Sequence, residues 1–326
     1  MAHQIDTTSR NTASYASTGE EWHGLGQRML PGATVEEWQT AANMDYKVQR
    51  GFIRYATSYL TPDAPIHNLQ KVDDKVVLFR SDTGAPLGVV SDGYKVVQPA
   101  EVLETFREWA GAGGMTIESA GVLFGGKRYF ATARVADAVS VDGGKDRIIP
   151  YALLSTSADG SLATEGRWTS VRVVCNNTLS MARSGQAAFR LTHRSAWKPE
   201  QFKKVIETAQ DDFAAFMQSS RTLAALQIQV KEAEDLTTML LTTGQRNADA
   251  ARESAGFGRI MSLFNGGGRG ATLETARETG WGWLNAVTEY VDHHARARSD
   301  ENRLVSALWG PGDDLKNKAR DLILSV

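Results

Sequence analysis

The sequence predicts an α+β protein: an antiparallel sheet core with helices, followed by a helical C-terminal part. Short alternating runs separated by Asp, Gly and Ser turns occupy much of residues 46–174. After Pro199, apolar residues instead recur at three- and four-residue spacing, which is typical of helices. Strands followed by helices in this order favour α+β over a parallel sheet. We therefore expect a flexible arm at residues 1–17, an α+β core at 18–198 and a helical region at 199–326.

Composition sets limits on function. The chain has 326 residues, of which 42% are hydrophobic and 23% charged, which is typical of a globular protein. The net charge of −2 gives no overall attraction to nucleic acid, so any such binding needs a local patch. The single cysteine, Cys175, argues against a disulfide framework or a zinc cluster.

The sequence predicts neither a membrane-spanning segment nor a signal peptide. No apolar run approaches the roughly 20 residues that span a bilayer, and the N-terminus reads as polar rather than as a signal peptide. We expect a cytoplasmic protein with no membrane partner and no cofactor.

The first part of the core begins with a short helix. Thr34 is placed to cap it, and Glu37 completes a capping box. Residues 46–97 then predict an antiparallel meander, because short apolar runs alternate with turns. Pro99 opens a second helix, which the glycines of residues 111–114 end.

A second sheet is expected over residues 115–170. Turns at Gly125-Gly126 and at Asp142-Gly143-Gly144 predict hairpins. Lys127 and Arg128 follow the first turn and form a basic hairpin tip. Such a tip either binds a phosphate or is simply solvated.

Residues 166–204 are the most informative stretch. Trp168, Ser170 and Arg172 alternate with Thr169 and Val171, so a strand would carry an aromatic and an arginine on one face and apolar side chains on the other. The pair Asn176-Asn177 then predicts a helix cap before residues 178–182.

Positive charge is concentrated after that strand. Phe189 and Trp197 lie among cations, with Glu200 as the one acid. Cations interleaved with aromatics are typical of a groove for single-stranded nucleic acid, although a solvated basic face over an ordinary core gives the same pattern. The residues we expect to bind nucleic acid are Arg167, Trp168, Arg172, Arg183, Arg190, Arg194, Trp197, Lys198, Lys127 and Arg128.

The helical region shows several amphipathic segments. Apolar spacing predicts helices over 202–217, 223–236, 257–264, 281–291 and 304–324. The glycine-rich run at 265–270 predicts a flexible loop. It is not a phosphate-binding loop, because no Lys-Ser or Lys-Thr follows it.

One cluster resembles an enzyme site. Asn285, Glu289 and His293 are spaced four residues apart and would share a helix face, with Asp292 adjacent. A Glu and a His at this spacing can bind a metal, but such a site needs ligands from a second helix, and no second Glu-x-x-His is present. A polar seam between helices or subunits explains the spacing equally well. We therefore predict neither a catalytic set nor a metal site.

Four motifs together resemble one family: WHGLG at 22–26, DGYKVVQ at 92–98, VRVVCNNTL at 171–179 and WGWLNAVTEYVDH at 281–293. They are similar to the phage/plasmid-like family built on domain of unknown function 932, which brings no established catalytic residues. The element order also resembles that of phage single-strand annealing proteins of the Redβ and RecT type, which implies a basic DNA groove and assembly into rings or filaments.

These observations favour a phage-encoded, non-enzymatic protein that binds and anneals single-stranded DNA in recombination. It would act as a homo-oligomer, either a ring or a filament. A regulatory protein whose basic surface meets an acidic protein is one alternative. A metal-dependent nuclease using Glu289, Asp292 and His293 is another. The sequence leaves open DNA versus RNA and the oligomer size.

Overall fold

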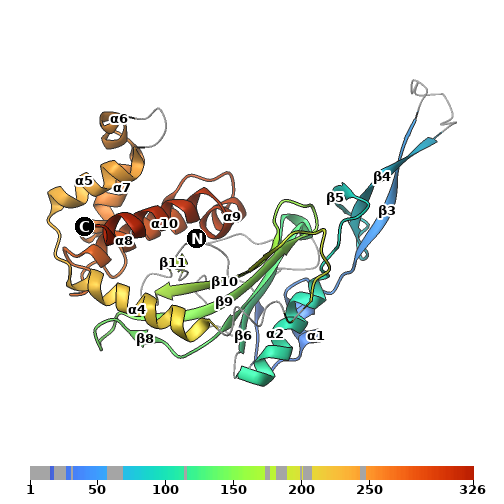
Figure 1. Cartoon of the computed structure of the whole chain (residues 1–326), viewed down its shortest axis with the longest axis horizontal. Helices are drawn as coiled ribbons and strands as arrows, with labels where there is room; N and C mark the ends of the chain where they lie inside the picture. Colours follow the sequence, from blue (N-terminus) through green and yellow to red (C-terminus); the bar gives the residue numbers. More distant parts are fainter. Residues whose placement is uncertain are drawn as a thin grey trace.

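A computed structural model places the chain as an elongated molecule with two sheets and a helical part (Figure 1). It describes residues 15–17, 27–30, 32–56, 69–113, 116–172, 177–180, 189–198, 200, 208–242 and 247–326. Antiparallel strands come first and helices gather in the C-terminal part, so the predicted α+β class is confirmed. The predicted division into an arm, a core and a helical region stays a prediction.

The smaller sheet has the order β3-β4-β5 and is antiparallel throughout. Its strands are β3 (Val48–Ala56), β4 (Leu69–Arg80) and β5 (Pro86–Ser91). Pairing with β5 covers only Lys75 to Phe79 of β4, so the outer parts of β3 and β4 form a two-stranded ribbon. This ribbon, the β3–β4 arm, projects from the body (Figure 1). The predicted meander is confirmed.

Two helices flank this sheet in the chain. Helix α1 (Val35–Ala41) begins at the expected capping box, in which Thr34 accepts from the backbone N–H of Glu37 and Glu37 accepts from that of Thr34. Helix α2 (Pro99–Gly113) starts at the proline as predicted.

The larger sheet has the order β11-β10-β9-β7-β6-β1-β2, with β12 added to β10 and β8 added to β9. Its strands are β1 (Tyr15–Ser17), β2 (Gln27–Arg28), β6 (Thr116–Leu123), β7 (Arg128–Arg134), β8 (Val139–Ser140), β9 (Arg147–Ser157), β10 (Thr164–Arg172), β11 (Asn177–Ser180) and β12 (Phe189–Leu191). A short 3-10 turn (Phe124–Gly126) joins β6 to β7. Strands β6, β7, β9 and β10 are successive antiparallel neighbours.

Both faces of this sheet are covered. Phe130, Tyr151 and Val171 share one face and pack with Leu304 and Leu308 of the C-terminal part. The alternate residues, among them Tyr129, Leu154 and Trp168, belong to the main core together with side chains of α2 and of the helices after residue 208. The predicted alternation is therefore correct, but neither face is open to solvent.

The helical part consists of α4 (Ala209–Ala225), α5 (Val230–Leu241), α6 (Ala248–Arg252), α7 (Ala255–Ser262), α8 (Gly280–Glu289), α9 (Asp300–Trp309) and α10 (Pro311–Leu324). Two π-helical turns, Leu263–Gly267 and Tyr290–His294, follow α7 and α8. The predicted helix over 223–236 is wrong, because the chain breaks between α4 and α5. Gln227 there forms a bridge with Thr279, and the Gln229 backbone N–H donates to Glu232 at the start of α5.

The helix expected after the Asn176-Asn177 pair is also wrong over residues 177–180. Those residues form β11, which pairs antiparallel with β10 from Thr169 to Arg172. The free edge of β10 offers backbone partners there, and the extended chain takes them in place of a helical turn.

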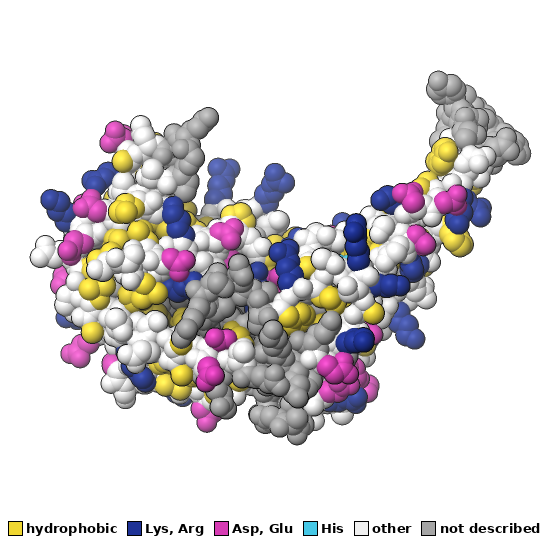
Figure 2. Space-filling model, in the orientation of Figure 1, with side chains coloured by type: hydrophobic (Ala, Val, Ile, Leu, Met, Phe, Trp, Pro, Cys, Tyr) yellow, Lys and Arg dark blue, Asp and Glu magenta, His cyan; other side chains and the backbone are white. Residues whose placement is uncertain are grey.

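The molecule is curved. In Figure 2 its upper outline is concave between the helical part and the β3–β4 arm, and Lys and Arg side chains line that side. Within the described residues, no helix is both long and apolar enough to cross a bilayer.

Candidate nucleic-acid interface

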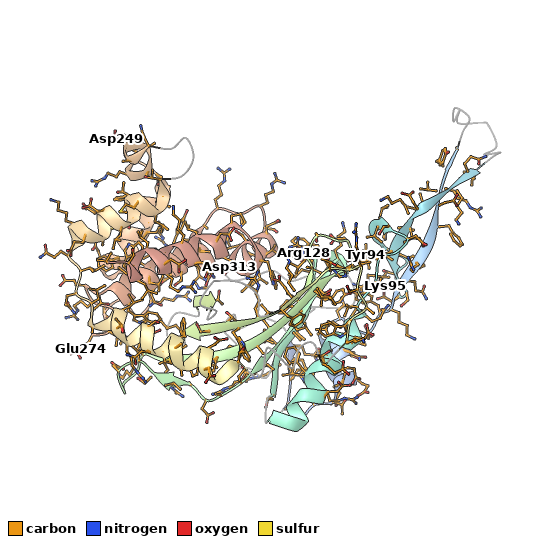
Figure 3. All side chains as sticks on the ribbon, viewed as in Figure 1. Tyr94, Lys95, Arg128, Asp249, Glu274 and Asp313 are labelled. Atoms are coloured by element: carbon orange, nitrogen blue, oxygen red, sulfur yellow. The ribbon has the colours of Figure 1, made fainter. Side chains whose placement is uncertain are left out.

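Six cations gather at the end of the larger sheet that adjoins β5. They come from three separate segments of the chain, and we call them the sheet-end cluster: Lys95, Lys127, Arg128, Arg190, Arg194 and Lys198. All are exposed except Arg128, which is half-buried. Figure 3 shows Tyr94, Lys95 and Arg128 close together at this end. A local patch of this kind is what a chain of near-zero net charge needs in order to attract a polyanion.

The turn between β9 and β10 holds Lys127 and Arg128 in place. Ser157 and Leu162 close the turn through the serine hydroxyl, which accepts from the Leu162 N–H at 3.0 Å. The Ala158 N–H donates to the Lys127 carbonyl at 2.7 Å, which fixes the hairpin tip against the turn. Arg128 Nε donates to Ser161 Oγ at 2.8 Å. Burial lowers the pKa of Arg128, with nearby Asp159 opposing that change, yet a guanidinium remains charged at neutral pH.

Residues 189–198 carry three more cations. Phe189 pairs with Gly166 of β10, and after a turn Trp197 stacks on the Phe189 ring, with 5.7 Å between centroids and 29° between planes. The two aromatic rings thus anchor the segment at both ends. Arg190, Arg194 and Lys198 are exposed.

His193 joins this segment to the loop that carries Lys95. Its ring stacks on Tyr94 with 4.3 Å between centroids. Its Nδ1 lies 3.1 Å from the Lys95 carbonyl oxygen and its Nε2 lies 2.9 Å from that of Leu162. Tyr94 in turn donates to the Ser157 carbonyl, and burial raises the pKa of Tyr94 to about 12. The cluster therefore rests on a bonded framework in which Tyr94 stays neutral.

Two residues expected to contact nucleic acid lie instead in the core, and a third is half-buried and ion-paired. Trp168 is 1% exposed, and its Nε1–H points at Thr208 Oγ1, 3.4 Å away, so neither ring face is open for stacking on a base. Arg172 is 3% exposed and bonds to Asp146. We remove both from the interface because helices cover their face of the sheet.

Arg167 is the third. Its Nε lies 2.8 Å from Glu165 and its Nη1 lies 2.6 Å from Asp313, on the face covered by the C-terminal helices. Burial alone would lower its pKa, but the two carboxylates outweigh burial and raise it. Arg167 is thus a cation paired with two carboxylates. Arg183 and Cys175 lie outside the described residues.

The polar residues at the end of α8 do not form the predicted helix face. The helix widens into a π-turn at Tyr290–His294, so the imidazole near Glu289 is that of His294, 3.8 Å away, rather than that of His293. Glu289 accepts the backbone N–H of Arg269, and burial raises the pKa of its carboxyl. Asn285 donates to the Trp281 carbonyl.

Asp292 faces a different neighbour. Both of its oxygens are occupied: Lys316 Nζ lies 2.9 Å from Oδ1, and the Thr178 N–H donates to Oδ2 at 2.6 Å. In the part of the chain that the structure describes, no group of three His, Cys, Asp or Glu side chains could hold a metal ion. Glu289, Asp292 and His293 accordingly do not converge.

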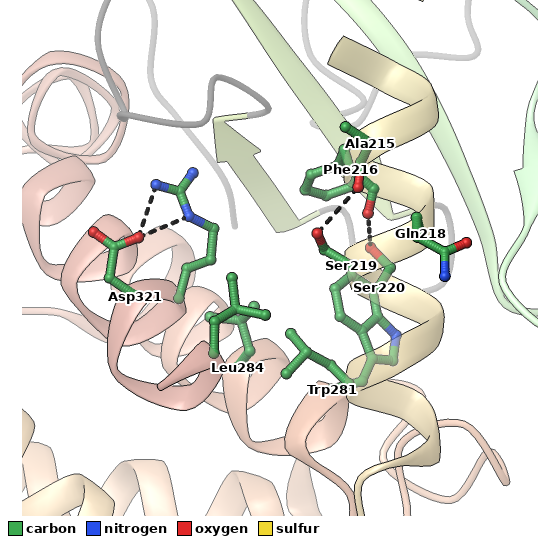
Figure 4. A pocket seen from close by; sticks show the side chains of 11 residues that line it. Ala215, Phe216, Gln218, Ser219, Ser220, Trp281, Leu284 and Asp321 are labelled. Atoms are coloured by element: carbon green, nitrogen blue, oxygen red, sulfur yellow. Dashed lines mark hydrogen bonds and ion pairs between the residues drawn. The ribbon is translucent and has the colours of Figure 1, made fainter. Parts of the chain in front are cut away.

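A pocket of about 340 Å³ lies between α4, α8 and α10 (Figure 4). Its wall is mainly apolar, and its two serines bond to their own helix: Ser219 to the Ala215 carbonyl and Ser220 to that of Phe216. At the rim, Arg320 pairs with Asp321 at 3.0 Å. The two serine hydroxyls and the Arg320–Asp321 pair already have partners, and we assign no reaction to this pocket.

The sequence did not point to Tyr94, Lys95 or His193. The first two lie in the DGYKVVQ motif, whose role as part of a site became visible only when the turn at 157–162 and residue 193 were placed beside it. A tyrosine, a lysine and a distant histidine carry no spacing signal along the chain.

Residues 86–309 match a family model described as Domain of unknown function (DUF932). The chain belongs to that family. The matched range begins at β5 and ends at the last residue of α9, so it includes the whole sheet-end cluster and leaves out both strands of the β3–β4 arm. This DUF932 protein matches no curated protein and no solved structure.

Proposed function

We propose that this DUF932 protein binds single-stranded DNA on the sheet-end cluster and brings complementary strands together for annealing. The observation that carries the proposal is that six cations, five of them exposed, lie on three segments that meet at one end of the larger sheet, in a chain of net charge −2. Successive phosphates of a flexible strand can each contact one of these cations. Each contact releases a counterion from the DNA, and this release supplies much of the free energy of binding.

The geometry supports a strand rather than a single phosphate. Lys95 belongs to the loop before α2, Lys127 to the β6–β7 tip, and Arg194 to the turn after β12. Cations spread over separate elements can each meet a different phosphate. The partly exposed ring of Trp197, stacked on Phe189, lies in the same segment and would offer a base a partner for stacking.

Further charge extends the surface. Arg296 and Arg298 are exposed in the loop before α9, and Figure 2 shows Lys and Arg side chains on both sides of the concave outline. A strand bound at the sheet end would run along this concave side. Action in the host-cell cytoplasm, an origin in phage and a likeness to single-strand annealing proteins belong to the same proposal.

An acidic protein partner is the second candidate, because the same cations would attract it. The two candidate functions predict different results with a DNA homopolymer: a DNA-binding protein binds it, and a protein specific for an acidic protein partner does not. Oligo-dT carries phosphates and bases without any protein surface, so its binding separates the candidates directly.

The test measures fluorescence anisotropy of labelled oligo-dT at several salt concentrations, followed by an annealing assay with two complementary strands that carry a donor and an acceptor dye. We expect binding that weakens as salt rises, and faster annealing than for the strands alone. Absence of oligo-dT binding at low salt would overturn the proposal. Binding without faster annealing would restrict the function to strand binding.

A further inference from the structure

Two π-helical turns lie next to each other in the helical part. Leu263–Gly267 follows α7 and Tyr290–His294 follows α8, and each turn also contacts the helix before the other turn. Such turns are rare and are frequently found at functional sites. The first contains the start of the glycine-rich run at 265–270 and the second contains the end of the WGWLNAVTEYVDH motif, and the sheet-end cluster uses neither. The junction of the two turns is therefore a second candidate site.

The imidazole of His294 lies at this junction, between a guanidinium and a carboxylate. Its Nδ1 is 3.0 Å from Arg259 Nη2 of α7, and its Nε2 is 3.8 Å from Glu289 Oε1 at the end of α8. Because a guanidinium can only donate, Nδ1 accepts from Arg259 and the neutral ring carries its proton on Nε2, toward Glu289. The side chain of His294 is 27% exposed and that of Glu289 is 6% exposed, so a solute can reach the imidazole.

The glycine-rich loop brings a second arginine to the junction. The backbone N–H of Arg269 donates to Glu289 Oε2 at 2.9 Å. Gly268 permits this close approach, because a Cβ at that position would lie 2.8 Å from the Leu263 carbonyl oxygen and 3.1 Å from Glu289 Oε2. The loop thus fixes the backbone of Arg269 and leaves its side chain at the surface.

Positive charge surrounds the His294 ring. Burial, followed by the charges of four neighbouring side chains, lowers the pKa of His294 to about 4; these neighbours are Arg259, His293, Arg269 and Arg303. Arg303 is already paired with Asp300, whereas Arg259 and Arg269 are exposed. Two exposed arginines thus stand beside an imidazole that stays neutral at pH 7.

Glu289 balances this charge only in part. It is 4% exposed, and burial raises the pKa of its carboxyl, with the N–H and the charge of Arg269 opposing that change. Even as a carboxylate, Glu289 supplies one negative charge against two exposed guanidinium groups. A surplus of positive charge remains, and an anion placed between Arg259 and His294 would balance it and favour the protonated ring.

We propose that this junction binds a phosphate group through Arg259, Arg269 and His294; with Glu289 these residues form what we call the π-turn site. A guanidinium offers paired N–H donors that match phosphate oxygens, and a protonated imidazole adds a further donor. A phosphate monoester carries a charge of about −1.5 to −2 at pH 7 and has three acceptor oxygens, so it can accept from all three side chains. The proposal does not depend on DNA binding by the sheet-end cluster, because the two sites share no residue.

The test follows the imidazole of His294 by two-dimensional NMR through a pH titration, once in chloride and once in inorganic phosphate at equal ionic strength. A nearby anion favours the charged ring, so phosphate should raise the midpoint from about pH 4 to about pH 5 or higher. Arg259→Gln should abolish most of this difference between the two salts, and Arg269→Gln should reduce it. The matched control, Arg252→Gln, removes an exposed arginine of α6 and should respond as wild type does. Urea unfolding shows whether each variant is folded.

Two sources of phosphate share this chemistry: a free phosphate compound and the phosphorylated end of a DNA strand. Fluorescence anisotropy separates them by comparing oligo-dT that carries a 5′-phosphate with oligo-dT that carries a 5′-hydroxyl. Tighter binding of the phosphorylated strand by wild type, lost in Arg259→Gln, would show that the π-turn site takes a DNA end. Equal affinity for the two strands, together with the response to inorganic phosphate, would show that it takes a free phosphate compound.

The same His294 midpoint in chloride and in phosphate would overturn the proposal, and so would a full response to phosphate in both Arg259→Gln and Arg269→Gln. Neither outcome bears on the sheet-end cluster, since the NMR samples contain no DNA. Arg190→Ala with Arg194→Ala, in contrast, should lose affinity for oligo-dT and keep the response of His294 to phosphate.

Discussion

Arg172 and Asp146 form a two-pronged ion pair in the core, with 2.6 Å from Nε to Oδ1 and 2.8 Å from Nη2 to Oδ2. The carboxylate also accepts from the Thr275 hydroxyl at 2.6 Å and from the Trp281 indole N–H at 3.0 Å. Asp146 therefore joins β10 to the segment that leads into α8. The pair fixes the helical part on the sheet.

Replacing Arg172 with Ala should destabilise the fold rather than weaken DNA binding. The change leaves the Asp146 carboxylate, which is fully buried, without its counter-charge, and the expected loss is about 3–5 kcal/mol in the free energy of unfolding. Urea unfolding measures it. Arg190→Ala serves as the matched control, with an expected change within about 0.5 kcal/mol because Arg190 is exposed. Equal stability of the two variants would contradict the structural role of Arg172.

The same comparison shows what the sequence could predict. Alternation along residues 168–172 correctly separated Trp168 and Arg172 from Val171, because the period of a strand is local. It could not tell that both faces are covered. The covering residues, such as Leu308, and the partners, such as Asp146 and Asp313, lie far away along the chain. Arg167 and Arg172 have no acidic partner that the sequence could identify, yet in the folded chain they form ion pairs with Asp313 and Asp146.

Among residues 189–198, Arg190, Arg194 and Lys198 are exposed, and their contact with nucleic acid stays a prediction. Lys95 and His193 were missed because only the turn at 157–162 brings them together. The break before α5 was missed because the apolar spacing continues across Leu226 and Ile228, which are positioned by the backbone of residues 278–280.

Lys316→Met should also cost about 3–5 kcal/mol in the free energy of unfolding, because it leaves the buried Asp292 without its ammonium partner. Adding Asp292→Leu should recover part of the loss, since an apolar pair replaces a buried charge. Urea unfolding of both variants, with Lys231→Met as an exposed control, measures this. A different result would support the metal-dependent nuclease: Asp292→Leu alone would leave the free energy of unfolding unchanged and would abolish a DNA cleavage that requires a divalent ion.

His294 should remain neutral at pH values well below those at which a histidine usually takes up a proton. Burial and then the Arg259 guanidinium, 3.0 Å from Nδ1, lower its pKa to about 4. The unfolded chain takes up this proton near pH 6.5 and the folded chain only near pH 4, so the stability that depends on neutral His294 is full above pH 6.5 and is lost as pH falls through that window.

Two-dimensional NMR of the imidazole during a pH titration checks this. Arg259→Gln should move the pKa of His294 upward, because it removes the nearby positive charge. His294→Gln should flatten the decline in stability between pH 6.5 and pH 4. A midpoint near 6.5 in the wild-type protein would refute the lowered pKa.

Binding of single-stranded DNA by the sheet-end cluster is tested most directly by the salt dependence of the affinity for oligo-dT. The measurement is the slope of log affinity for oligo-dT against log salt, for wild type and for Arg190→Ala with Arg194→Ala. Each lost phosphate contact on a single strand removes about 0.7 of a released ion, so the slope should fall by roughly 1.4 and affinity should drop.

The control replaces two exposed arginines outside the cluster, Arg107→Ala with Arg277→Ala, at equal change in net charge. We expect its slope to match that of wild type. Both double variants should unfold at the wild-type urea midpoint. A folded Arg190/Arg194 variant that keeps the wild-type slope and affinity would contradict the account and place the binding surface elsewhere.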